Sequence, residues 1–98
     1  MNTLSLFRNE KNPLVLPAGS VIFEKGQAGD VMYVVLDGTV DITVDGHQVD
    51  QLSPGDLFGE MALVDSSPRS ATATAATDAK LAEVDLRRFQ FLIQNTPF

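Results

Sequence analysis

Short apolar stretches separated by turn-forming residues run through most of this chain. Glycine or proline recurs from residue 13 onward, at Pro13, Pro17, Gly19, Gly26, Gly29, Gly38, Gly46, Pro54, Gly55 and Gly59. This spacing predicts the short strands and tight turns of an all-β roll or sandwich. Before these turns, the pattern favours only a short helical turn within residues 3–11, whose apolar members are Leu4, Leu6 and Phe7.

The middle of the chain predicts three strands and one tight turn. Val31–Leu36 is apolar throughout and contains three valines, which predicts a strand covered on both faces. In residues 40–44, valine and isoleucine alternate with aspartate and threonine, the period-two pattern of a half-buried strand. Asp45-Gly46 supplies the positive φ angles of a tight hairpin turn, which leads into a further strand at His47–Leu52.

Small residues characterise the next predicted strand. Ser70–Ala76 alternates serine or threonine with alanine. Because alanine is a poor strand former, its repeated use on one face indicates close packing against another part of the molecule. Thr77-Asp78 then turns the chain into the last predicted strand, Lys80–Val84.

A helix is predicted after the last strand. Asp85 is a suitable N-cap, and Pro97 is expected to stop the helix. Apolar residues fall along one face of this helix, at Leu86, Phe89, Leu92 and Ile93. Arg87 and Arg88 are expected to form its exposed face.

Length and composition indicate one ordinary globular domain. A chain of 98 residues suffices for one modest core, and its longest apolar run, Val31–Leu36, is far short of the roughly 20 residues that a membrane helix needs. Nothing near Met1 resembles a secretory signal. We therefore expect a cytoplasmic protein, or the cytoplasmic piece of a larger one. The absence of cysteine excludes disulfides, thiolate catalysis and cysteine-based metal sites.

The charge of the chain bears on its partners. Seven Lys and Arg stand against thirteen Asp and Glu, a net charge of −6. Proteins that hold DNA or RNA usually carry a basic face, because neutralising phosphates dominates that affinity. Direct nucleic-acid binding is therefore not expected, and an anionic ligand would have to be captured by local geometry.

One stretch carries the candidate function: Phe58-Gly59-Glu60-Met61-Ala62-Leu63-Val64, then Asp65-Ser66-Ser67, then Pro68-Arg69-Ser70-Ala71-Thr72. It resembles the phosphate-binding cassette of cyclic-nucleotide-binding domains, the family that includes the catabolite activator protein, protein kinase regulatory subunits and nucleotide-gated channels. The family's strand-and-turn pattern continues upstream, at Leu16-Pro17-Ala18-Gly19, Ile22-Phe23, Gly26, Gly29-Asp30, Met32-Tyr33-Val34-Val35 and Gly38. The resemblance covers residues 13–95.

The resemblance implies a mainly β fold, an antiparallel, jelly-roll-like β-roll with a short phosphate-binding helix and flanking helices. It implies one domain over residues 1–98 that binds cyclic AMP, with cyclic GMP as the second candidate, and performs no catalysis. No catalytic residue, metal or further cofactor is expected. Some side chains of Val31–Leu36 are expected to line the pocket for the base.

Physical chemistry supports the same ligand. Gly59 lets the backbone approach closely, and Glu60–Val64 can form one helical turn. The first N–H groups of a helix lack internal partners, so a phosphate could bind those of Glu60, Met61 and Ala62.

The arginine that follows suits a phosphate as well. Pro68 restricts how Arg69 is presented, and Arg69 offers a planar charged fork to the phosphate oxygens. Ser70 can add a hydroxyl and a backbone donor.

Two finer expectations come from the family. Ionised Glu60 only accepts hydrogen bonds, and in the family the residue at this position binds the ribose 2′-hydroxyl. In the family, threonine after the arginine tends to accompany binding of cyclic GMP, whereas alanine or serine tends to accompany binding of cyclic AMP. Ser70 therefore favours cyclic AMP.

Family members usually continue into a longer helix that covers the base and often dimerises. This chain stops at Phe98, so we expect a domain without that lid. The apolar surface of Leu86, Phe89 and Leu92 could then favour a homodimer, and an effector domain could be attached or associated.

Several alternatives stay open. Glu60 and Arg69 could form a structural salt bridge that closes a loop, and Ser70 could be a turn residue. The chain could also be a degenerate β-roll that contacts other proteins without binding nucleotide. A metal-dependent cupin is disfavoured, because one histidine and no cysteine leave too few ligands.

Overall fold

The computed structural model describes residues 3–7, 9–65 and 67–95. Strands form most of the structure, in the order β1 (Leu14–Leu16), β2 (Val21–Phe23), β3 (Val31–Asp37), β4 (Val40–Val44), β5 (His47–Leu52), β6 (Leu57–Phe58), β7 (Thr72–Ala75) and β8 (Ala79–Asp85). The helices are short, namely α1 (Thr3–Leu6), α2 (Met61–Val64) and α3 (Leu86–Asn95). The predicted mainly β fold is therefore confirmed.

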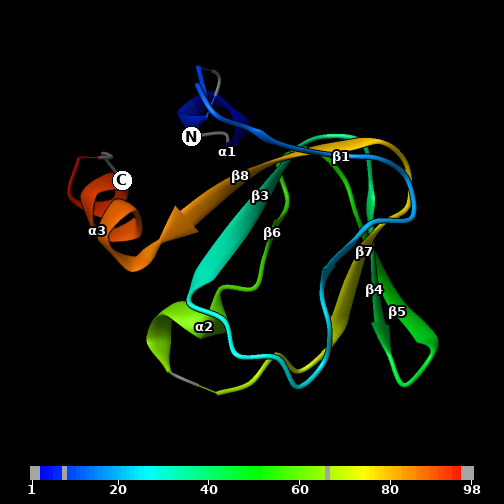
Figure 1. The fold of residues 1–98 in the computed structure, drawn as a ribbon. Helices are drawn as coiled ribbons and strands as arrows, with labels where there is room; N and C mark the ends of the chain where they lie inside the picture. The colour runs from blue at the N-terminus through cyan, green and yellow to red at the C-terminus, as the bar shows by residue number, and fades with distance from the viewer. Residues whose placement is uncertain (1–2, 8, 66, 96–98) are drawn as a thin grey trace.

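The described strands form two four-stranded antiparallel sheets that face each other (Figure 1). One sheet has the order β1-β8-β3-β6 and the other β2-β7-β4-β5. Neighbours in each sheet are mostly distant in sequence, as the pairing of Tyr33 with Glu83 shows. Because consecutive strands cross repeatedly between the sheets, residues near position 23, position 58 and position 69 come together at one end of the roll.

The main core fills the space between the two sheets. Its buried members are Phe23, Tyr33, Val35, Val40, Leu52, Phe58, Ala73 and Leu81. The rings of Phe23, Tyr33 and Phe58 lie within 5.2–6.0 Å of one another, centroid to centroid, a range in which aromatic pairs attract beyond their area burial. The aromatic cluster packs beneath the end of the roll where β2 and β6 finish.

A second core lies on the outer face of the first sheet. Met32 and Val34 point there, whereas Tyr33 and Val35 point inward. The helices cover this outer face: Leu63 of α2 and Phe89 of α3 pack on it. Burial on both faces explains why β3 is apolar throughout, and the prediction made for Val31–Leu36 is confirmed.

Local predictions agree with the structure at the central hairpin. Asp45 and Gly46 have φ angles of 51° and 84°, the paired positive values of a tight hairpin turn. In β4, Val40 is fully buried but the remaining residues are all half-buried, so the expected alternation is weak. Ala73 and Ala75 are buried in β7, where their small size allows the sheets to approach closely.

The C-terminal helix begins as predicted. The Asp85 carboxylate accepts a hydrogen bond from the Arg88 backbone N–H at 2.8 Å, the geometry of an N-cap. Phe89 and Leu92 are partly buried against the second core, and the expected self-association stays a prediction. Leu86 is exposed. The predicted stop at Pro97 lies outside the described residues.

Arg88 differs from the prediction that it lies on the exposed face of α3, because its side chain also contacts other parts of the protein. Its guanidinium donates to Glu10 at 2.6 Å and to the Glu83 carbonyl at 2.9 Å, and it lies over the Phe7 ring. This contact joins α3 to the segment that follows α1. The helix α1 itself is shorter than the helical turn predicted within residues 3–11.

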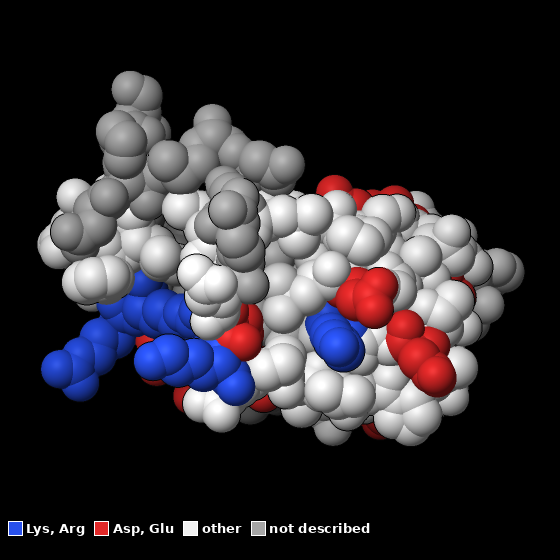
Figure 2. Space-filling model, turned by 90° about the horizontal axis from the view of Figure 1, so that it is seen from above, with Lys and Arg blue, Asp and Glu red and all other residues white. Residues whose placement is uncertain are grey.

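Seen from above, basic side chains gather at the end where α1 and α3 lie (Figure 2), and acidic ones lie beside basic ones elsewhere on this face. None of the described helices could span a membrane.

Candidate functional site

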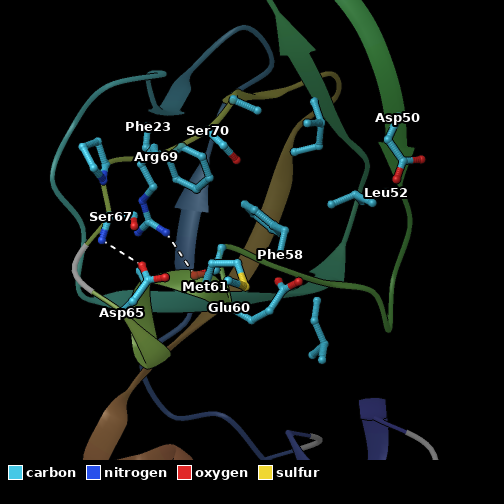
Figure 3. A pocket seen from close by; sticks show the side chains of 16 residues that line it. Phe23, Asp50, Leu52, Phe58, Glu60, Met61, Asp65, Ser67, Arg69 and Ser70 are labelled. Atoms are coloured by element: carbon cyan, nitrogen blue, oxygen red, sulfur yellow. Dashed lines mark hydrogen bonds between the residues drawn. The ribbon is translucent and has the colours of Figure 1, made fainter.

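A cavity of about 470 Å³ opens at the end of the roll near α2 (Figure 3). Its size is that of a small-molecule site. It is lined by Phe23, Ile42, Asp50, Leu52, Leu57, Phe58, Gly59, Glu60, Met61, Ala62, Asp65, Ser67, Pro68, Arg69, Ser70 and Ala71. The structure therefore places all six predicted site residues, Gly59, Glu60, Met61, Ala62, Arg69 and Ser70, around one cavity.

The start of α2 forms one wall of the cavity. Gly59 has a φ angle of 77°, a left-handed value that reverses the chain between β6 and α2 and that only glycine adopts freely. Leu63 is buried against β3 and anchors the helix. Within the described chain, the N–H groups of Glu60 and Met61 have no protein acceptor, whereas that of Ala62 donates to the Gly59 carbonyl at 3.2 Å. Two of the three predicted backbone donors therefore have no protein partner and belong to residues that line the cavity.

Arg69 is the dominant group of the opposite wall, and it is buried, with 7% of its surface exposed. Its guanidinium donates to the carbonyls of Val31 at 2.8 Å and Gly59 at 3.1 Å. The Phe23 ring lies beneath it, 4.2 Å from ring centroid to Cζ, so the cation also gains a cation–π contact. The Nε–H is buried without a partner.

The backbone of Arg69 is held as firmly as its side chain. Its N–H donates to the Gln27 carbonyl, and its own carbonyl accepts from the Gly26 N–H, both at 2.8 Å. These paired bonds fix the arginine to the loop between β2 and β3. The sequence does not predict this loop as part of the site.

Two glycines make room for the guanidinium. A Cβ atom at Gly59 would lie 2.7 Å from Nη1 of Arg69, and one at Gly29 would overlap the guanidinium directly. Gly29 follows the family pattern in the sequence, but its role is visible only when the loop is folded over Arg69.

The proposed structural salt bridge is not formed. Arg69 is bonded to carbonyls and Glu60 is exposed at the cavity mouth, and the two form no ion pair in the part of the chain that the structure describes. Ser70 is exposed and lines the cavity. Nearby, hydrogen bonds from the Ser67 side chain and backbone hold the pKa of the Asp65 carboxyl below its usual value.

The far wall of the cavity was not predicted. It comes from the second sheet, where Ile42, Asp50 and Leu52 face the cavity. Val31–Leu36 does not contribute to the lining; its side chains are taken up by the two cores. The expectation that some of them line the base pocket is therefore wrong, because both faces of β3 are already covered.

The described residues contain no cluster of three or more His, Asp or Glu side chains placed to hold a metal ion. What the cavity offers is a buried cation, two backbone N–H groups without a protein partner, and an apolar floor, with three exposed carboxylates at its rim, those of Asp50, Glu60 and Asp65. These groups can bind and orient a small anion attached to a less polar body.

Comparison with known proteins places this geometry in a family. The family model described as "Cyclic nucleotide-binding domain" matches residues 13–96. A cyclic nucleotide-gated potassium channel of Rhizobium etli is 42% identical over 87% of this chain and 24% of its own length. A cAMP-dependent protein kinase regulatory subunit of Eremothecium gossypii is 37% identical over 96% of this chain and 20% of its own length.

Solved structures agree with the sequence comparisons. The catabolite activator protein of Thermus thermophilus superposes with a TM-score of 0.75 and 35% identity, over 85% of this chain and 41% of that one. The chain spans about a quarter or less of the length of the channel and of the kinase regulatory subunit. By its sequence, its two-sheet roll and its cavity, this chain belongs to the cyclic nucleotide-binding domain family.

Proposed function

We propose that this domain binds a cyclic nucleotide, cyclic AMP, in the cavity beside α2, without turning it over. The observation that carries the proposal is the buried guanidinium of Arg69. Within the described chain it has carbonyl partners but no carboxylate partner. Because a buried charge is costly unless it is paired, the site favours an anion that can supply the missing counter-charge.

The cyclic phosphate fits this requirement. Arg69 would hold its oxygens with the charge-assisted hydrogen bonds that guanidinium forms with phosphate. The open N–H groups of Glu60 and Met61 lie in the same cavity wall and would add backbone donors. Ser70, also in the lining, would add its hydroxyl.

The sugar and base would occupy the rest of the cavity. Glu60 is exposed at the mouth and, being acceptor-only when ionised, would bind the ribose 2′-hydroxyl. The base would then extend over the apolar floor toward the second sheet. Serine rather than threonine after Arg69 favours cyclic AMP over cyclic GMP, and the kinase regulatory subunit among the relatives is named for cyclic AMP.

The biological role that we propose is regulatory. The relatives are several times longer than this chain, and their names describe proteins gated or regulated by nucleotide. Binding at this domain would accordingly control an effector that is attached to it or associated with it.

Isothermal titration calorimetry with cyclic AMP tests the proposal. Saturable one-site binding is expected, with the nucleotide recovered intact by chromatography. Linear 5′-AMP is the control ligand, since it keeps the base, the sugar and a phosphate but lacks the ring, and it should bind much more weakly. Absence of binding would favour a β-roll used for protein contacts, and recovery of linear AMP from cyclic AMP would show an enzyme.

A further inference from the structure

The wall of the cavity opposite Arg69 carries a carboxylate of its own, apart from those of Glu60 and Asp65 beside α2. Arg69 lies at one end, and the Asp50 carboxylate lies at the other, on strand β5 beyond Leu52 (Figure 3). Asp50 is two residues from Leu52, so both lie on the inner face of the second sheet. Across the hairpin, Asp50 pairs with Ile42, which also lines the cavity. Asp50 is exposed, so its carboxylate lies at the solvent-facing rim of this wall, beside the apolar side chains of Ile42 and Leu52.

Asp50 has free capacity to accept hydrogen bonds. One of its oxygens accepts the N–H of the adjacent Gln51 at 2.9 Å, and the other has no partner within the described residues. The lining side chains that can donate, Ser67, Arg69 and Ser70, all belong to the segment that forms the opposite wall. The end formed by β4 and β5 therefore offers an acceptor between apolar groups and no donor side chain.

We propose that Asp50 is a specificity-determining residue, which selects a base whose far edge donates a hydrogen bond. This inference rests on the proposed function, because it assumes that a cyclic nucleotide is anchored by Arg69. The exocyclic 6-amino group of adenine donates, whereas guanine carries an acceptor carbonyl at position 6 and has its donors at N1 and the 2-amino group. In the orientation that we propose, Asp50 meets position 6, where its carboxylate would pair with the adenine amine and repel the guanine carbonyl, so Asp50 favours cyclic AMP.

A structural role for Asp50 makes a different prediction. Strand β5 is an edge strand of its sheet, and inward-pointing charges on edge strands prevent pairing with other chains. In that role Asp50 would influence aggregation and leave base selection unchanged. The two roles can therefore be separated by ligand binding.

The test compares Asp50→Asn with the wild-type protein, using two ligands. One is cyclic AMP; the other is the cyclic monophosphate of purine riboside, which has the same ring system without the 6-amino group. Asparagine keeps an acceptor oxygen but loses the charge, so a charge-assisted hydrogen bond becomes a neutral one, and cyclic AMP binding should weaken roughly 5- to 10-fold. Binding of the purine riboside ligand should change less than about twofold.

Asp41→Asn is the matched control. Asp41 lies on β4, pairs with Gln51 in register, and does not line the cavity, so this variant removes the same charge from the opposite face of the sheet. It should leave the affinities for both ligands unchanged.

The outcomes separate the two proposals. An equal loss for both ligands in Asp50→Asn, no loss for either, or a loss confined to the purine riboside ligand would overturn the role of Asp50 while leaving nucleotide binding intact. Failure of the wild-type protein to bind either ligand would instead overturn the proposed function.

Discussion

The state of Arg69 shows what a binding residue requires before its ligand arrives. The guanidinium is buried over Phe23 and bonded to two carbonyls, those of Val31 and Gly59. These contacts are neutral, so they orient the cation without neutralising it. The side chain is thus positioned in advance, which reduces the conformational entropy that a ligand must overcome.

Replacing Arg69 should affect binding more than any other single change. Arg69→Leu removes one member of a desolvated charge pair, which costs on the order of 2–5 kcal/mol, or roughly 30-fold or more in Kd. Arg69→Lys keeps the charge but loses the planar fork, so its loss should be smaller. Calorimetry gives both affinities, and thermal unfolding of each variant controls for loss of fold. Wild-type affinity in Arg69→Leu would mean that the ligand lies elsewhere.

Gly59 offers a second test at single-residue scale. Gly59→Ala must adopt a left-handed φ angle, at about 1–2 kcal/mol, and also places a methyl group 2.7 Å from the guanidinium of Arg69. Gly19→Ala is the control, because Gly19 has a φ angle of 89° but open space around its Cβ position. Both variants should lose stability in urea, but only Gly59→Ala should also lose nucleotide affinity. Equal affinities in the two variants would contradict the proposed role of the close approach.

At the scale of elements, α2 depends on tertiary packing. A helix of one turn has almost no stability of its own, and Leu63 attaches it to the outer face of β3. Leu63→Ala should therefore cost about 2–5 kcal/mol of unfolding free energy and weaken nucleotide binding. Met61→Ala, at an exposed position in the same helix, should change stability by well under 1 kcal/mol. Denaturant unfolding distinguishes the two, and a stable Leu63→Ala protein would contradict this anchoring.

The N-terminus of α3 provides a further test. Asp85→Ala removes the side chain that accepts the Arg88 backbone N–H at 2.8 Å, and losing such a cap typically costs about 1 kcal/mol. Gln90→Ala, at an exposed position of the same helix, should be neutral or slightly stabilising. Thermal unfolding monitored by circular dichroism measures both. If Asp85→Ala were as stable as wild type, the cap would contribute nothing.

The sequence predicts those elements whose determinants are local. Adjacent residues determine three of these features, and the structure contains each of them: the Asp45-Gly46 turn, the cap at Asp85 and the two-sided burial of Val31–Leu36. Contacts between distant segments could not be predicted in the same way. Arg88 meets Glu10 across 78 positions, and nothing in their neighbouring residues indicates that α3 will pack beside the N-terminal segment.

At the scale of the whole molecule, the cavity is a product of the topology. The six residues of the predicted site lie within twelve positions of one another, so their proximity follows from the chain itself. The wall formed by Ile42, Asp50 and Leu52 arises because β6 and β5 belong to different sheets that face each other. Sequence spacing carries no information about that juxtaposition, which is why Asp50 becomes a candidate only in the folded protein.

In this topology the two cores support different parts of the site. The inner core fixes Phe23 beneath Arg69, and the outer core fixes α2 through Leu63. The cation and the open N–H groups are thus held from opposite faces of one sheet. Since both are rigidly supported, a ligand that joins them should stabilise the entire domain.

Nitrogen-15 NMR of the wild-type protein during titration with cyclic AMP tests phosphate binding at Arg69 most directly. Saturation should shift the backbone amides of Gly59 to Ala62, Arg69 and Ser70. It should also shift the side-chain Nε–H of Arg69, assigned from its loss in Arg69→Lys. The buried Nε–H should change most, because it has no protein partner in the free domain. Saturable binding that leaves this resonance and the Gly59–Ala62 amides unmoved would contradict the proposed site.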